Sequence, residues 1–164
     1  MHLPAHQFLD ARAITYQKLS FAVETEQGAA SVARVLGYRD RQMVKTLIFV
    51  TGADEKVLVM LAADATAVSG HLKRALGSRN IKLAAPDMVQ AATGYAIGSI
   101  PPFHWQPSGF RSFIDAGLMR ERVVGVGAGV WGQEIMLTPA NLVKASQAVI
   151  VNLSDTSQPV FAAA

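Results

Sequence analysis

The stretch QMVKTLIFVTGADEKVLVML, residues 42–61, consists of two apolar, β-branched runs on either side of a Gly-Ala-Asp-Glu turn. Runs of this composition predict β-strands, and the turn between them predicts an antiparallel hairpin. Lys45 is the charged residue within the first run. We expect its ammonium to leave the sheet either at a cavity face, as a functional group, or at the start of the strand, where it reaches water.

Short helices and strands alternate on both sides of this hairpin. The start at Thr138 and Pro139 is the clearest helix signal, because Thr is a favoured N-cap and Pro a favoured first helical residue. This mixture predicts an α+β fold with a mixed sheet, in a single domain over residues 1–153 followed by a loose tail at 154–164. Helices are predicted at 4–12, 28–37, 69–77, 86–94 and 138–146, and further strands at 14–23, 110–115, 122–129, 133–137 and 149–153.

Composition limits the class of protein. Of the 164 residues, 51% are hydrophobic and 16% charged, which is typical of a compact folded domain. There is no apolar run of about 18 residues and no signal-peptide pattern, so we expect a cytoplasmic protein that does not bind membranes. The absence of cysteine excludes disulfides and thiolate sites. The net charge of +3 allows an anionic partner, although the basic residues are also explained as a solvated surface.

Several familiar site motifs are absent or unconvincing. GAGVWG, residues 127–132, has the G-x-G-x-x-G spacing of dinucleotide-binding folds, but a strand pattern follows it where a helix would be needed. We therefore interpret these glycines as turn and close-approach residues within a sheet. The four histidines lack the spacing of metal ligands, and no Gly-x-Ser-x-Gly motif is present. We predict neither a metal nor a cofactor.

The stretch TGYAIGSIPPFHW, residues 93–105, is an unusual loop. Gly98 allows close backbone approach, and Pro101 and Pro102 restrict the chain, so this is either a stiffened connection or a rim that holds backbone groups toward a ligand. Asp115 and Glu134 are acidic candidates that are also explained as strand-edge charges. A lysine, a rigid loop and a carboxylate suit the binding and polarisation of a carbonyl or phosphate better than a catalytic triad.

Five segments in order make the chain resemble the YbaK/prolyl-tRNA synthetase-associated editing domain family over roughly residues 5–153. The lysine of VKTL and the loop GSIPP, which fits the G-x-x-x-P pattern of the family, are the most specific of its features. The segments are AASVARVLG (29–37), QMVKTLIFV (42–50), TGYAIGSIPPF (93–103), FIDAGLM (113–119) and GVGAGVWGQEIMLTPANLVKAS (125–146).

The resemblance implies an open, barrel-like mixed sheet flanked by helices, and a free-standing deacylase that hydrolyses mischarged aminoacyl-tRNA. Its expected partners are the acceptor end of the tRNA and, optionally, an aminoacyl-tRNA synthetase, with the protein acting as a monomer or homodimer. The resemblance implies catalytic roles for Lys45, Gly98 and Glu134. The substrate-binding residues that it implies are Ser99, Ile100, Pro101, Pro102, Phe103 and Asp115.

Three departures from the family leave the preferred amino acid unassigned. Phe103-His104-Trp105 stands where many relatives have Phe-Gly-His, Gly132 stands where many have histidine, and Gly28 or a neighbour replaces a phenylalanine. The nucleophile is expected to be water or the terminal ribose hydroxyl, because no side chain is an obvious general base. The alternative is a module of the same fold that binds tRNA ends or nucleotides without turnover.

Overall fold

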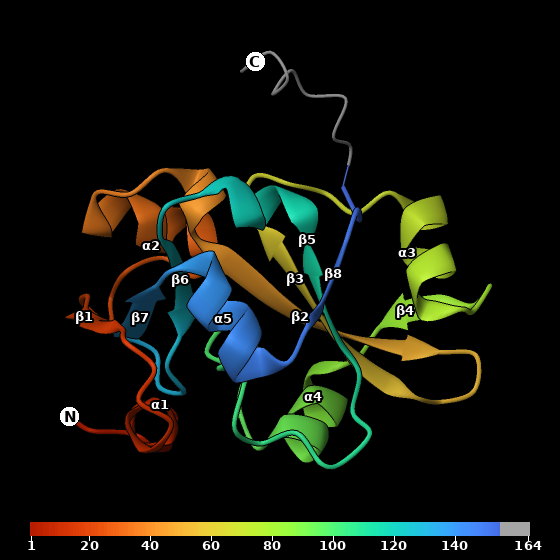
Figure 1. The fold of residues 1–164 in the computed structure, drawn as a ribbon, viewed down its shortest axis with the longest axis horizontal. Helices are drawn as coiled ribbons and strands as arrows, with labels where there is room; N and C mark the ends of the chain where they lie inside the picture. Colours follow the sequence, from red (N-terminus) through yellow and green to blue (C-terminus); the bar gives the residue numbers. More distant parts are fainter. Residues whose placement is uncertain (155–164) are drawn as a thin grey trace.

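The computed structural model describes residues 1–154, which fold into short helices packed on two sheets (Figure 1). The predicted loose tail therefore lies outside the described residues except for Ser154, which is buried. The elements follow the predicted order, and β4 and two 3-10 helices add to it. They are α1 (Pro4–Ala11), β1 (Gln17–Ser20), α2 (Ala29–Leu36), η1 (Asp40–Gln42), β2 (Val44–Thr51), β3 (Lys56–Ala62), α3 (Ser69–Leu76), β4 (Ile81–Leu83), α4 (Pro86–Thr93), β5 (Ser112–Asp115), η2 (Ala116–Arg120), β6 (Val124–Gly127), β7 (Gln133–Leu137), α5 (Pro139–Ser146) and β8 (Val149–Val151).

The predicted hairpin is confirmed and lies within the larger sheet. β2 and β3 pair antiparallel over their whole length, and the sheet continues as β4-β2-β3-β5-β8, in which β5 runs parallel to β3 and to β8. The smaller sheet is antiparallel, in the order β1-β7-β6. The α+β class with mixed strand directions is thus confirmed, and the sheets do not close into a barrel.

A parallel bridge between Met43 and Gly125 connects the two sheets. It brings the start of β2, in the large sheet, beside β6 of the small sheet. In Figure 1 the three-stranded sheet lies at one end of the molecule, near α1 and α2, while α3 and β4 lie at the opposite end. The start of β2 is therefore the point where the two sheets meet.

The two faces of the large sheet pack against different helices. Ile48, Met60 and Ile114 join the main core, together with Leu142 of α5. On the opposite face the alternate residues of β3, which include Leu61, pack with Leu72 and Leu76 of α3. Met43 packs on that same face with Val32 and Ala33 of α2, in a third cluster. Because side chains alternate along a strand, α2 and α3 cover one face, with Lys45 between them.

Candidate active site

Lys45 lies on the same sheet face as two positions of the smaller sheet. Met43 and Gly125 are bridge partners, and a Cβ built on Gly125 would meet the side chains of Met43 and Met136, so all three point to one face. Alternation places Lys45 and Gly127, two residues further on, on that face as well. Lys45 is half-buried and makes no ion pair or side-chain hydrogen bond within residues 1–154.

Glu134 is the acidic residue of this face. It pairs with Gly127 across β6 and β7 and with Leu19 across β1, and its side chain is 7% exposed. Burial raises the pKa of the Glu134 carboxyl to about 8, because removal from water disfavours its charged form. No hydrogen-bond donor contacts this carboxyl among the described residues. An unpaired, buried carboxyl is available to a cationic or hydrogen-bonding ligand.

The predicted Gly-Pro loop packs directly on this face. A Cβ on Gly127 would lie 3.0 Å from the Ser99 carbonyl carbon and 3.3 Å from its Cα. A Cβ on Gly129 would lie 2.8 Å from the ring of Tyr95. The glycines of β6 and of the turn that follows it therefore make room for the loop, which lies beside Glu134. The sequence predicted close approach at these glycines but not the segment that approaches them.

The aromatic residues that follow the prolines hold the loop in shape. Trp105 donates its indole N–H to the Pro101 carbonyl at 2.6 Å, and Gln106 donates to the Pro102 carbonyl at 2.9 Å. The Tyr95 hydroxyl lies 2.6 Å from Nε2 of His104, which adopts a φ of 79° that a non-glycine residue rarely takes. These contacts, all made within residues 95–106, hold the loop in one shape.

The loop presents backbone groups and hides its large side chains. Gly98 is exposed and has a φ of 91°, which favours glycine. The Ser99 N–H donates to the Ala96 carbonyl, whereas the N–H groups of Gly98 and Ile100 have no acceptor within residues 1–154. The Ile100 side chain and Phe103, which stacks on Phe8, belong to the core. Pro101 and Pro102 are also buried.

Comparisons with known proteins identify the family of the chain. The family model described as the aminoacyl-tRNA editing domain matches residues 23–145, which is well over half of the chain.

The chain belongs to the aminoacyl-tRNA editing domain family.

Relatives of this editing domain match over most of its length. The Multifunctional Ser/Thr-tRNA deacylase ProXp-y of Escherichia coli K12 is 28% identical over 93% of this chain and 94% of its own. A candidate Cys-tRNA(Pro)/Cys-tRNA(Cys) deacylase of Enterococcus faecalis, EbsC, is 24% identical over 82% of each chain. The crystal structure of hypothetical protein APE2540 superimposes with a TM-score of 0.81 at 27% identity, covering 91% of this chain and 97% of its own.

Asp115 of the editing domain is bonded by its own chain. Its carboxylate is 2% exposed and accepts hydrogen bonds from the N–H groups of Leu153 and Ser154 at 2.8 and 3.2 Å, and from the Ser154 hydroxyl. The chain itself thus uses both oxygens. These contacts anchor the segment after β8 to Asp115. Asp115 lies two residues after Phe113, so alternation places it on the sheet face that α3 covers and that also carries Lys45, and its substrate-binding role stays a prediction.

Gln27 is a candidate that the sequence did not suggest. Its side-chain oxygen lies 3.2 Å from the position a Cβ of Gly98 would take, so it stands beside the loop at the start of α2. Gln27 is exposed and precedes Gly28, the N-cap of α2. A lone polar residue before a helix carries no sequence signal, and only the fold brings it to the loop.

The glycine-rich motif forms a hairpin, as the sequence analysis expected. β6 and β7 pair antiparallel from Val124 with Leu137 to Gly127 with Glu134, so no helix follows these glycines. A dinucleotide-binding turn needs that helix, and the dinucleotide-binding interpretation of this motif is therefore excluded. Within residues 1–154 no three His, Asp or Glu side chains are grouped closely enough to hold a metal ion.

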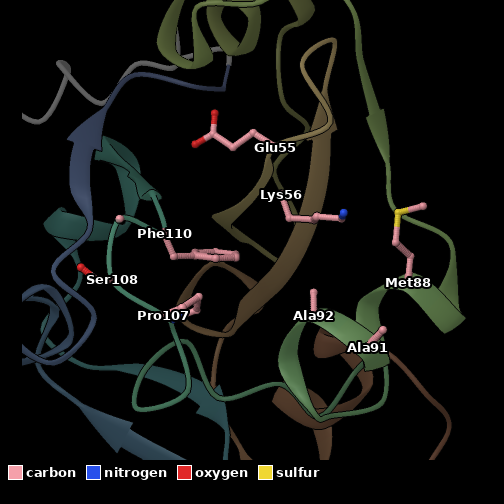
Figure 2. Close-up of a pocket in the computed structure, with 9 residues that line it drawn as sticks. Glu55, Lys56, Met88, Ala91, Ala92, Pro107, Ser108 and Phe110 are labelled. Carbon is pink, nitrogen blue, oxygen red and sulfur yellow. The ribbon is translucent and has the colours of Figure 1, made fainter.

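A separate pocket lies at the far end of the β2–β3 hairpin (Figure 2). It has a volume of about 470 Å³, between α4 and the loop at 107–110. Figure 2 shows the Lys56 side chain extending toward Met88 and the Phe110 ring lying in the pocket. Glu55 at its edge is paired with Arg111 at 2.7 and 2.8 Å. None of the predicted site residues lines this pocket, so it is distinct from the candidate active site.

Proposed function

We propose that this chain is a free-standing aminoacyl-tRNA deacylase, which hydrolyses the ester bond between a wrongly attached amino acid and the 3′ end of tRNA. The observation that supports this proposal is that Gly127, the partner of Glu134, contacts the Ser99 backbone, and that the Met43–Gly125 bridge puts the strand of Lys45 beside the same hairpin. The names of the relatives supply the substrate class. None of the helices within residues 1–154 combines the length and the hydropathy needed to cross a membrane.

The loop backbone would stabilise the charge that develops on the ester oxygen. Of the three N–H groups between Gly98 and Pro102, those of Gly98 and Ile100 have no acceptor in the described chain, and we assign them to the oxyanion. Donors already held in place cost no reorganisation during the reaction, and losing one such donor typically raises the barrier by about 2.7–4 kcal/mol. The buried prolines and Phe103 then contribute by holding the loop rather than by touching substrate.

Lys45 would bind the tRNA side of the ester, and Glu134 would bind the amino-acid side. Lys45 offers a point charge with three donors to the phosphate of the terminal nucleotide. Glu134 accepts the ammonium of the attached amino acid, whose positive charge favours the ionised carboxylate and offsets the effect of burial. Water adds to the ester carbonyl, or the free ribose hydroxyl adds first and forms a new ribose ester, to whose carbonyl water then adds. The water step releases the amino acid as its free acid, and the attacking O–H supplies the proton. The C–O bond to the ribose breaks, and the ribose oxygen gains the proton.

We further propose that the substrates carry small side chains and arise from errors of an aminoacyl-tRNA synthetase. The E. coli relative is named for Ser and Thr, and the E. faecalis relative for Cys, including Cys on tRNA(Pro). We place the protein in the cytoplasm, where aminoacyl-tRNAs are formed, and we assign no permanent synthetase contact.

Single-turnover deacylation of a panel of aminoacyl-tRNAs tests the proposal. The panel contains Ser-, Thr-, Cys- and Ala-tRNAs, with Phe-tRNA as the bulky comparison. We expect at least one small aminoacyl ester to be hydrolysed well above the buffer rate, and Lys45→Ala to lose at least about tenfold of that rate, equivalent to about 1.4 kcal/mol. Lys82→Ala, an exposed lysine of β4, is the matched control.

Binding of tRNA without hydrolysis of any ester in the panel would instead identify a binding module. Hydrolysis at the wild-type rate by Lys45→Ala would remove the lysine from the mechanism and leave the activity intact.

A further inference from the structure

A second cavity begins at Lys45 and extends away from the candidate active site toward α3. It has a volume of about 310 Å³, at the lower end of the range for small-molecule sites. Its lining residues come from β2, β3, α3, β4 and the segment before α3. They are Lys45, Leu47, Phe49, Leu61, Thr66, Ala67, Ser69, Leu72, Lys73 and Ile81.

The charges of this cavity favour an anion. Lys45 and Lys73 both line it, no acidic side chain does, and neither lysine forms an ion pair within residues 1–154. Two lysines that line one cavity with largely apolar walls favour a positive local potential. Of these two lysines, only Lys45 belongs to the candidate active site, so Lys73 has no role there.

The remaining lining residues favour a flat base with hydroxyl groups. Phe49 offers a half-buried aromatic surface beside Leu47, and the exposed Thr66 and Ser69 place hydroxyls at the cavity. Single-stranded RNA is commonly bound by stacking a base on an aromatic ring, with polar side chains on its edges and on the 2′-hydroxyl. The lysine suits the phosphate of a nucleotide, the aromatic ring suits its base, and the hydroxyls suit the base edge and the 2′-hydroxyl.

The position of the cavity determines which nucleotide this would be. One face of the joined sheets carries Glu134 on β7, Gly127 on β6 and Lys45 on β2. Phe49 lies on the same face of β2, four residues beyond Lys45, which is about 13 Å along the strand. An extended strand whose terminal aminoacyl nucleotide lies at Glu134 therefore passes Lys45 and enters the cavity with its preceding nucleotide.

We propose that this cavity binds the penultimate nucleotide of the tRNA 3′ end, with its base on Phe49 and its phosphate on Lys73. This inference rests on the proposed function, because it extends the same substrate. Every tRNA ends in the same CCA sequence, so the cavity contributes affinity common to all tRNAs and leaves amino-acid choice to the loop and Glu134.

Binding of the RNA tetranucleotide ACCA tests the inference without requiring hydrolysis. We expect Lys73→Ala to weaken binding about tenfold and to lower the salt dependence by about 0.7 in logarithmic slope, the value for one phosphate contact to a single strand. Arg74→Ala changes the next residue of α3, which is exposed and does not line the cavity, and should bind like wild type.

An abasic penultimate nucleotide should also cost wild type about tenfold in affinity, since one stacked base is typically worth about 1–3 kcal/mol. Equal affinities of the Lys73→Ala and Arg74→Ala variants, or no loss with the abasic RNA, would overturn the inference. Cytidine monophosphate binding as tightly as ACCA would reassign the cavity to a free nucleotide and would also overturn it.

The two proposals can fail separately. Normal ACCA binding that depends on Lys73, without hydrolysis of any ester, supports the nucleotide cavity and rejects the deacylase. Hydrolysis that is normal in Lys73→Ala, with no change in KM, rejects the cavity and keeps the deacylase.

Discussion

The backbone of Ser99 occupies the space that a side chain on Gly127 would fill, with contacts of 3.0–3.3 Å to the position of the missing Cβ. Gly127 pairs with Glu134, so this contact places the Gly-Pro loop beside the buried carboxyl. The absence of one side chain in a hairpin thus sets the position of a loop nearly thirty residues earlier in the chain.

Gly127→Ala should displace the loop and impair hydrolysis. A Cβ at 3.0 Å from a backbone carbon cannot be relieved by rotating a side chain, so the loop itself must move. We expect a loss of single-turnover deacylation of about a hundredfold, typical of a misplaced reacting group, and a stability cost of about 1–3 kcal/mol. Stopped-flow deacylation and thermal unfolding measure the two effects.

Gly70→Ala is the matched control for this substitution, because Gly70 lies in α3 and a Cβ there meets nothing within 4 Å. A Gly127→Ala enzyme of wild-type activity would show that the loop position is unimportant for the reaction.

Glu134→Gln should make the protein more stable at high pH. The folded state keeps the Glu134 proton up to a pKa of about 8, whereas the unfolded chain loses it near the ordinary value of 4.5. Stability contributed by this proton is therefore complete below about pH 4.5 and is lost as pH rises through about 8. The Gln variant has no such loss, so its advantage should grow across this window.

Thermal unfolding at pH 4, 6 and 9 measures this difference. We expect a Tm advantage of several degrees for Glu134→Gln at pH 9, since about 1 kcal/mol shifts the Tm of a domain of this size by about 2–4 °C. The two proteins should have similar Tm values at pH 4. Glu24→Gln, at an exposed position, should show no trend. A pH-independent difference for Glu134→Gln would mean that the carboxyl is ionised in the folded protein.

Asp115→Asn should weaken the fold without changing the reaction. The substitution replaces an acceptor oxygen that bonds Leu153 or Ser154, and a buried hydrogen-bond group left unsatisfied typically costs about 1–3 kcal/mol. Urea unfolding should show this loss, while deacylation per folded molecule stays at the wild-type value. Asp64→Asn, at an exposed site, controls for the change of charge. A large activity loss in fully folded Asp115→Asn protein would return the residue to substrate binding.

Local sequence was sufficient to predict most of the helices and strands, whereas the chemistry of the loop stays a prediction. Thr138 caps α5 through its hydroxyl, which accepts from the Asn141 N–H at 3.1 Å, as expected from Thr-Pro. β4 was not predicted, because a three-residue edge strand has too few residues to show alternation. The sequence did not predict that Asp115 anchors the chain, because a carboxylate that anchors the chain and one that binds a ligand look alike in sequence.

The sequence by itself determined the hairpin at 42–61, the helix starts, the glycine turns and the set of residues that resembles an editing domain. These features depend on neighbours within a few positions, where propensity and periodicity act. Only the tertiary structure decided that Lys45, Gly127 and Glu134 share one face, that Ile100 and Phe103 are buried, and that Gln27 stands beside Gly98. Those relationships depend on the pairing of strands far apart in the chain, which no local pattern encodes.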